Sequence, residues 1–489
     1  MFSILHISDL HRSPRDPISN AELLSALVMD RERYVNEDPP IRAPDAVIVS
    51  GDIIQGVPLR APNAAAELAN QYSSAEAFLR EVANQFVAGD RSRVIVVPGN
   101  HDIDWNVARS AMSLVGVEDA PSNLAATLFA DESQYRWNWK TRELYRISDD
   151  ARYASRLDAY WEFHDRFYAG VGGLLRVSRG AEANLFSLCD GRIGVAAFNS
   201  CHGNDCFAFH GRIPGHVVAQ ANMDLFAAPN SFDLHVAVWH HSIEGPPYRT
   251  DYMDVETVRA MIGRGFRLGL YGHQHRAQAA PHQVHLPDRE TMAVVSAGSL
   301  CAGAEELPPG QHRQYNVVEV ADDFRSARVH VRTMTAGNLF GRTPLMSFGG
   351  KSYAGLEWEL PPDLGGRRAT AAVARVRAAV QNAEAQLRGG DAVGCIQTLR
   401  AHRPRLDDYG RRLLLEAATA SLDWQFVLEL TEPPTSIQDL VTRVSAFVAT
   451  GDREGGLAAL ENFARALNLD AATERELRAR VDLEAVVAQ

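Results

Sequence analysis

Residues 2–11 read FSILHISDLH, an apolar run that ends in an acidic and a basic side chain two positions apart. Such a run is typical of a strand covered on both faces. In extended backbone, residues i and i+2 point to the same side, so Asp9 and His11 should converge on one point. A carboxylate and an imidazole placed in this way can grip one metal ion.

Four further polar blocks follow apolar strands along the chain. They are Ser50-Gly51-Asp52 after AVIV, Pro98-Gly99-Asn100-His101-Asp102 after VIVV, His240-His241 after HVAVW, and Gly272-His273-Gln274-His275 after LGLY. Taken alone, a histidine at a strand end or a Gly-Asp turn is more often structural than a ligand. Together, the blocks supply nitrogen and oxygen ligands without thiolates, a set that suits Mn, Fe, Zn, Co or Ni.

The five blocks DLH, GD, GNHD, WHH and GHQH resemble, in type and order, the signature of the calcineurin-like metallophosphoesterase superfamily. The resemblance covers about residues 1–340. It implies an α/β fold, a four-layer α/β/β/α sandwich, with two metals about 3.5–4 Å apart at the carboxyl ends of the strands. By the same resemblance, Asp52 bridges the metals. The first metal is then held by Asp9, His11, Asp52 and His275, and the second by Asp52, Asn100, His240 and His273.

The expected cofactor is a pair of divalent or mixed-valence metal ions, with Mn²⁺ favoured and Fe, Zn, Ni and Co as alternatives. Two cations that share a water lower its pKa, and they bind the phosphoryl oxygens. We expect His101, outside the metal sphere, to protonate the leaving group. Asp102 is expected either to orient His101 or to cap the turn. The candidate substrate contacts are Arg12, His202 and His241. For Arg12 the alternative is an ordinary surface position. His241 is placed here because it lies farther from the strand tip than His240 does.

One position departs from the family pattern. Many relatives read G-D-x-x-[D/N] in the second block, and the last residue buttresses the catalytic histidine, whereas this chain has Gln55. A neutral amide cannot stabilise an imidazolium by charge. We therefore expect weak assistance to the leaving group, so that esters with good leaving groups react best.

The resemblance implies a metal-dependent phosphohydrolase, and we favour a phosphodiesterase that acts on a nucleotide or a nucleic-acid phosphodiester. The GNHD block is similar to that of cyclic-nucleotide phosphodiesterases. A net charge of −12 disfavours nucleic-acid binding by the surface as a whole and leaves local basic patches open. The alternatives are a phosphomonoesterase for a protein or a small molecule, and a scaffold without catalysis whose helical tail is the interaction surface.

The chain divides into three predicted regions. Residues 1–345 form the metallophosphoesterase domain, with a helical insertion at about 103–190 whose aromatic rings either pack the core or stack a nucleobase. Residues 346–366, rich in Gly and Pro, form a linker. Residues 367–489 form an α-helical domain that resembles tetratricopeptide repeats, with turns at Gly390-Asp391, Leu422-Asp423 and Gly451-Asp452, and is a candidate surface for a protein partner.

The predicted strands of the first region are Phe2–Ile7, Ala46–Val49, Val94–Val97, Ile193–Phe198, His235–Trp239, Leu268–Tyr271, Met292–Ser296, Tyr315–Val320 and Ala327–Thr333. The apolar runs are too short for a membrane-spanning helix, so we expect no membrane contact. The start of the chain has no basic lead-in, so we expect no signal peptide. Five scattered cysteines argue against a disulfide framework, which leads us to expect a cytoplasmic protein.

Overall fold

The computed structural model places the chain in two compact units, Met1–Arg368 and Ala369–Gln489. It describes residues 1–489 except 14–15, 17, 129, 131, 229–231, 245–250, 284–290, 303–306, 308–309, 344–349, 362–370, 404–405, 468 and 488–489. Each unit is described by itself below.

The first sheet of the N-terminal unit begins at the segment that opens the chain. Its strand order is β15-β14-β13-β1-β2-β3, and a further strand, β16, pairs with β14. The strands β1, β2 and β3 are mutually parallel, with Ile4 opposite Ala46 and Val47 opposite Val94. The members are β1 (Phe2–Ile7), β2 (Ala46–Val49), β3 (Val94–Val96), β13 (Gln314–Val320), β14 (Ser326–Thr335), β15 (Leu339–Arg342) and β16 (Ala354–Glu357).

The second sheet has the order β11-β12-β10-β9-β8-β7. The strands β8, β9, β10 and β12 run parallel to one another, while β7 and β11 are antiparallel strands at the two edges. The members are β7 (Ala183–Leu188), β8 (Ile193–Phe198), β9 (Leu234–Val238), β10 (Phe266–Tyr271), β11 (Gln278–Gln283) and β12 (Thr291–Ser296). Parallel strands covered on both faces explain the continuous apolar runs in the sequence.

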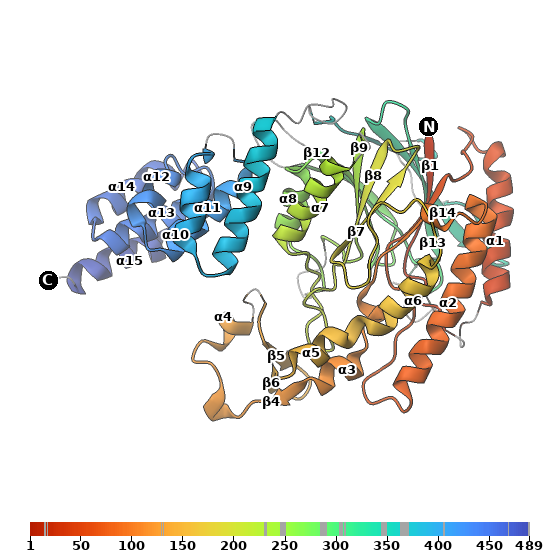
Figure 1. The fold of residues 1–489 in the computed structure, drawn as a ribbon, viewed down its shortest axis with the longest axis horizontal. Coiled ribbons are helices and arrows are strands. Elements are labelled where there is room, and N and C mark those ends of the chain that lie inside the picture. Colours follow the sequence, from red (N-terminus) through yellow and green to blue (C-terminus); the bar gives the residue numbers. More distant parts are fainter. Residues whose placement is uncertain are drawn as a thin grey trace. The chain divides into compact units, whose positions relative to one another are not determined.

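Helices cover the outer faces of the two sheets (Figure 1). Alternate residues of the second sheet show the layering, because Val195 and Val236 join the core that contains Ile4, whereas Ala196 and Ala237 join a core with the helices α7 (Gly215–Ala227) and α8 (Val255–Ile262). On the other side, α1 (Asn20–Arg33) and α2 (Ala64–Val87) contact the first sheet. The predicted sandwich is therefore confirmed.

The insertion that was predicted to be helical is a mixture of helices and strands. A three-stranded sheet, β4-β6-β5, is built from β4 (Met112–Leu114), β5 (Tyr135–Asn138) and β6 (Glu143–Ile147). It lies among α3 (Trp105–Ser110), α4 (Leu124–Leu128), α5 (Asp150–Ala154) and α6 (Asp158–Tyr168), with short 3₁₀ turns between them. These strands are short and polar, so they carry no apolar run that would predict them. Of the aromatic side chains, those of α6 pack in the main core, including Tyr160, Phe163 and Phe167.

The predicted linker at 346–366 is also partly ordered as a strand. Residues Ala354–Glu357 form β16, which pairs with β14 antiparallel, with Ala354 opposite Val329. The Gly- and Pro-rich composition predicted an irregular segment, but an edge strand needs only one partner and tolerates such a sequence. Residues 346–349 and 362–366 of that segment lie outside the described residues.

The C-terminal unit is a run of helices that contact their neighbours in chain order. They are α9 (Ala371–Arg388), α10 (Ala392–Arg400), α11 (Asp408–Ala420), α12 (Trp424–Leu430), α13 (Ile437–Thr450), α14 (Arg453–Phe463) and α15 (Ala471–Val487). The three predicted turns lie between helices, and Asp391, Asp423 and Asp452 cap α10, α12 and α14 through their side chains. The likeness to tetratricopeptide repeats and the protein partner stay predictions. Among the described residues, no helix combines the length and apolar character needed to cross a bilayer.

Candidate metal centre

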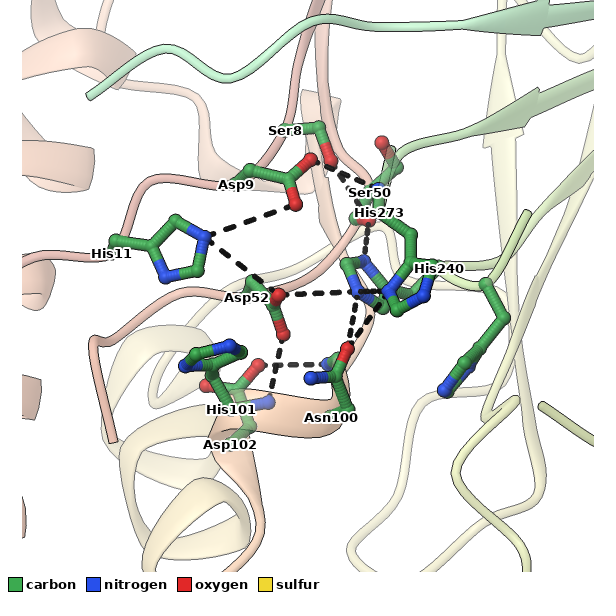
Figure 2. A network of polar contacts seen from close by, with 12 residues as sticks. Ser8, Asp9, His11, Ser50, Asp52, Asn100, His101, Asp102, His240 and His273 are labelled. Atoms are coloured by element: carbon green, nitrogen blue, oxygen red, sulfur yellow. Dashed lines mark hydrogen bonds and ion pairs between the residues drawn. The ribbon is translucent and has the colours of Figure 1, made fainter. Parts of the chain in front are cut away.

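The predicted ligands gather where parallel strands of both sheets end (Figure 2). Asp9 and His11 follow β1, Asp52 follows β2, and Asn100 follows β3. His240, His273 and His275 follow β9 and β10 of the second sheet. Since the carboxyl ends of parallel strands meet at one edge of a sheet, the topology brings segments from residue 9 to residue 275 into one cluster.

The first group of ligands contains Asp9, His11, Asp52 and His275. His11 Nε2 lies 3.1 Å from His275 Nε2, 3.9 Å from Asp9 Oδ1 and 3.8 Å from Asp52 Oδ2. His275 Nε2 lies 3.3 Å from Asp9 Oδ1. These atoms surround a common centre at separations that one cation with bonds of about 2.1 Å can span.

The second group contains Asp52, Asn100, His240 and His273. His240 Nε2 lies 3.2 Å from Asp52 Oδ2 and 3.0 Å from Asn100 Oδ1. His273 Nδ1 lies 2.9 Å from Asn100 Oδ1 and 3.2 Å from His240 Nε2. Asp52 Oδ2 therefore faces both groups, which is the position of a bridging ligand.

The backbone of the ligand loops is held in an uncommon conformation. Five of the seven predicted ligands have positive φ angles, which are 50° at Asp9, 43° at His11, 50° at Asp52, 75° at His273 and 52° at His275. In non-glycine residues this left-handed region is sparsely populated and costs about 1–3 kcal/mol per residue, so it persists only where the surroundings enforce it. Its concentration here marks the cluster as a functional site.

Glycines allow the ligand loops to pack directly against one another. A Cβ atom at Gly99 would lie 2.2 Å from Asp52 Oδ1, and one at Gly51 would lie 2.4 Å from His240 Nδ1. One at Gly272 would lie 2.6 Å from Asp9 Oδ2. The glycines of the GD, GNHD and GHQH blocks thus provide the close approach that places ligands from different strands together.

The arrangement fits metal ions better than it fits a hydrogen-bond network. Asp9 Oδ1 is buried and faces the His275 ring nitrogen at 3.3 Å without a well-formed hydrogen bond, which is costly unless another group satisfies it. Two imidazole nitrogens 3.1 Å apart, such as those of His11 and His275, match the separation of about 3.3 Å between nitrogens on one tetrahedral cation. His240 Nδ1 donates to the Ser50 carbonyl oxygen at 2.8 Å, which turns Nε2 toward the cluster.

The protonation states of His11, Asp9 and Asp52 also favour metal binding, whereas His240 must give up a proton to bind a cation. Burial and the neighbouring His101 lower the pKa of His11 to about 3, so its ring is neutral and can donate a lone pair. Burial alone would raise the pKa of Asp9 and Asp52, but the adjacent His275 and His240 lower both below the usual range. For His240, burial opposes the charged form, yet the Asp52 carboxylate raises the pKa to about 9 in the absence of a cation.

His101 lies at the rim of the first group, with its ring centre 4.6 Å from that of His11. Its Nδ1 donates to the Gln55 carbonyl oxygen at 2.7 Å, and its backbone N–H donates to Asp52 Oδ1 at 2.8 Å. Because a carbonyl only accepts, Nδ1 carries a proton and Nε2 is left for other partners. The ligand atoms of His101, His11 and Asp52 also lie close together, so these three side chains form a third group that could hold a cation.

The Asp102 carboxylate stabilises the turn that follows β3. It accepts hydrogen bonds from Gly99 N at 2.8 Å, Ile53 N at 3.2 Å and the Tyr72 hydroxyl at 3.0 Å. Burial and the Asp52 carboxylate raise the pKa of Asp102 to about 7. Of the two predicted roles, these contacts match the structural one, while the His101 ring is oriented by Gln55.

Two of the three predicted substrate contacts, Arg12 and His241, are buried in the structure. Arg12 is buried, not exposed, and its guanidinium donates to the Ile18 carbonyl and pairs with Asp16 at 3.0 Å. His241 is fully buried, and its two ring nitrogens lie 2.8 Å from Ser200 Oγ and 3.1 Å from Asn204 Nδ2. Both side chains are engaged inside the protein, which excludes the surface position considered for Arg12, while their roles as substrate contacts stay predictions.

His202 is the predicted contact that remains accessible. Its side chain is 29% exposed, and Nδ1 lies 3.1 Å from Glu182 Oε1. It lines a cavity of about 560 Å³ together with Tyr153, Arg156 and Trp161. His202 follows β8, whose carboxyl end lies at the same edge as the metal ligands, so its role as a substrate contact stays a prediction.

Several functional contacts have no signal in the sequence. The Gln55 and Ser50 contributions come from backbone carbonyls, which residue type does not reveal. Asp251 lies 3.5 Å from His273 Nε2 and belongs to no recognisable block. A carboxylate in this position would fix the orientation of the ligand His273.

The match to one family model agrees with the geometry of the site. A sequence model described as calcineurin-like phosphoesterase matches residues 2–277. No curated protein sequence matches the chain. Solved structures similar to it include one of PhoD, at 11% identity over 70% of this chain and 68% of that chain, with a TM-score of 0.38. Another is Vps29 complexed with Zn²⁺ from Entamoeba histolytica, at 9% identity over 69% and 94%, with a TM-score of 0.26. A third is the phosphoesterase YfkN from Bacillus subtilis, at 11% identity over 85% and 98%, with a TM-score of 0.27.

Proposed function

The chain belongs to the calcineurin-like phosphoesterase family, and we propose that it is a phosphodiesterase that hydrolyses a nucleotide or nucleic-acid phosphodiester at a dinuclear metal centre. The observation that carries the proposal is the position of Asp52, whose Oδ2 lies 3.8 Å from His11 Nε2 and 3.2 Å from His240 Nε2. One carboxylate thus serves two groups of ligands.

Different residues of the chain have different roles in the proposed reaction. When bound, two cations would supply Lewis acidity to the phosphoryl oxygens and lower the pKa of a water. Asp52 holds the two positions together, and Ser50 fixes the ring of His240. His101, oriented by Gln55, presents Nε2 to donate a proton to the leaving oxygen. Because the carbonyl of Gln55 is neutral, it orients this ring without a full counter-charge, which supports a preference for good leaving groups.

The charge around the site supports a diester over a monoester. A monoester dianion requires more neutralising charge than a diester monoanion. Arg12, the cationic side chain that the sequence places beside the first ligands, is turned into the interior toward Asp16. The positive charge next to the phosphoryl group would then come from the cations and His101.

The proposal is tested with the full chain loaded with Mn²⁺ and assayed on bis-p-nitrophenyl phosphate and p-nitrophenyl phosphate. We expect faster turnover of the diester. Asp52→Asn should abolish turnover and lower metal content, because it removes the shared charge. Asp233→Asn, which removes only a surface ion pair with Arg192, is the matched control and should change neither.

Two outcomes would contradict the proposal. Faster turnover of the monoester would identify a phosphomonoesterase. Turnover of neither ester by protein that demonstrably binds metal would favour a scaffold. The identity of the metal is open in this proposal, and Mn²⁺, Zn²⁺, Co²⁺ and Ni²⁺ should be compared for turnover.

A further inference from the structure

The hairpin β5–β6 of the insertion presents exposed aromatic and basic side chains together. Residues 136–146 read RWNWKTRELYR. Trp139 at the tip is 75% exposed, and Trp137 contacts it edge to face at a centroid distance of 6.3 Å. Because side chains alternate along a strand, Trp137 points away from the side occupied by Arg136, whose guanidinium is buried. Beyond its contact with Trp137, most of the Trp139 indole is open to solvent.

The tip of the hairpin is held by the side chain of Asn138. Its Oδ1 accepts the backbone N–H groups of Lys140 at 3.0 Å and Thr141 at 3.3 Å. The backbone carbonyl oxygen of Asn138 accepts a hydrogen bond from the backbone N–H of Arg142 at 2.7 Å. The turn therefore has a defined shape, and the indole of Trp139 is presented on an ordered loop.

The hairpin is basic in a chain that is acidic overall. Residues 136–146 contain four basic side chains and one acidic side chain, in a protein of net charge −12. Lys140, Arg142 and Arg146 are exposed. The acidic residue, Glu143, accepts hydrogen bonds from the Thr141 and Tyr145 hydroxyls. The tip thus offers positive charge beside an aromatic ring.

The base of the hairpin is fixed to a loop that contacts His241, the residue that follows the predicted ligand His240. Arg136 Nε donates to Asp205 Oδ2 at 2.5 Å, and the Tyr153 hydroxyl donates to the same carboxylate at 2.6 Å. Next to Asp205, the Asn204 side-chain amide nitrogen lies 3.1 Å from Nε2 of His241. Trp139 lies three residues along the strand from Arg136, a span of about 10 Å.

From this geometry we propose that the hairpin binds single-stranded nucleic acid, with a base stacked on Trp139 and phosphates beside Lys140 and Arg142. Aromatic rings interleaved with cations bind single strands by stacking and charge, without reading sequence. A duplex is a poor fit, because the faces of its bases are already stacked. The inference rests on the proposed function, since the strand held here would be the phosphodiester substrate of the metal centre.

The test measures binding apart from catalysis. Fluorescein-labelled single-stranded oligothymidylate is titrated with the full chain in the presence of chelator, which prevents cleavage, and fluorescence anisotropy is recorded. We expect Trp139→Ala to weaken binding about fivefold or more. Lys140→Glu should weaken it and reduce its dependence on salt. Val35→Ala, at a residue 70% exposed, and Lys351→Glu, the other lysine, are matched controls and should bind as the wild type does.

Hydrolysis of bis-p-nitrophenyl phosphate by the metal-loaded protein is the second readout, and the two controls, Val35→Ala and Lys351→Glu, should leave it unchanged. Equal oligonucleotide binding by the wild type and both hairpin variants would overturn the inference. No binding by the wild type, or stronger binding to phosphatidylserine vesicles or to duplex, would also overturn it. If the wild type fails to hydrolyse the diester while the binding pattern holds, the catalytic proposal fails and the strand-binding surface stands.

Discussion

Replacing Gly99 with alanine should dismantle the metal centre from a position that is not itself a ligand. The backbone at Gly99 has φ of −118°, which alanine adopts freely, so the substitution introduces a steric change only. The new Cβ would lie 2.2 Å from Asp52 Oδ1 and 2.4 Å from Asp52 N. Carbon and oxygen atoms approach to about 3.3 Å, so the carboxylate must move by about 1 Å. Metal–ligand distances tolerate only about 0.2 Å, and a misplacement of this size can cost about 10²-fold in rate.

We therefore expect Gly99→Ala to lower kcat/KM for bis-p-nitrophenyl phosphate about 10²-fold or more and to reduce bound metal, measured by mass spectrometry after dialysis. Gly203→Ala is the matched control, because its Cβ would meet nothing closer than His210 Nε2 at 3.8 Å. Thermal unfolding of both variants checks that the fold is kept. Full metal content and full turnover in Gly99→Ala would refute the bridging role of Asp52.

Three further predictions concern single histidines. His101→Ala should lower kcat about 10²-fold, the lower end for general acid catalysis, with metals retained and with a larger effect on alkyl than on aryl esters. Metal loss would show instead that His101 is a ligand. His240→Ala should lose bound metal. His241→Asn should retain most of it, because the His241 ring contacts Ser200 and Asn204 and not the metal centre. More metal in His240→Ala than in His241→Asn would show that His241 is the ligand. Burial lowers the pKa of His164 from 6.5 to about 4, so the unfolded chain binds a proton that the folded chain does not, and stability falls as pH drops from about 6.5 to 4. Urea unfolding of His164→Phe should therefore lose about 2 kcal/mol less between pH 7 and pH 5 than the wild type does, and an equal loss would exclude this histidine as a source of acid sensitivity.

The parts of the fold that were predictable are those in which burial determines composition. The strands at Phe2–Ile7, Ala46–Val49 and Ile193–Phe198 have the predicted bounds, because strands covered on both faces must be apolar throughout. The strands β4, β5, β6, β7, β11, β15 and β16 were not predicted, and each lies at the edge of a main sheet or in the small sheet of the insertion. Composition carries little information about such strands.

In the metal centre, too, some features were predictable from the sequence and others were not. The five blocks, and the family signature that they resemble, were enough to expect Asp9, Asp52 and His240 in one place. The left-handed backbone of Asp9 could not be read from an aspartate in a strand-end motif, and the buried orientation of Arg12 depends on Asp16 and the Ile18 carbonyl. Contributions from carbonyl oxygens are likewise invisible in the sequence, because every residue has one.

Both groups of ligands combine side chains from the two sheets, since His275 completes the first and His240 and His273 complete the second. Neither group can exist until the sheets have packed face to face. For protein production, the ratio of bound metal to protein would then report what fraction of a preparation has assembled its N-terminal unit correctly. A shortened chain that stops before residue 240 lacks His240, His273 and His275, so it should emerge from purification without its metals.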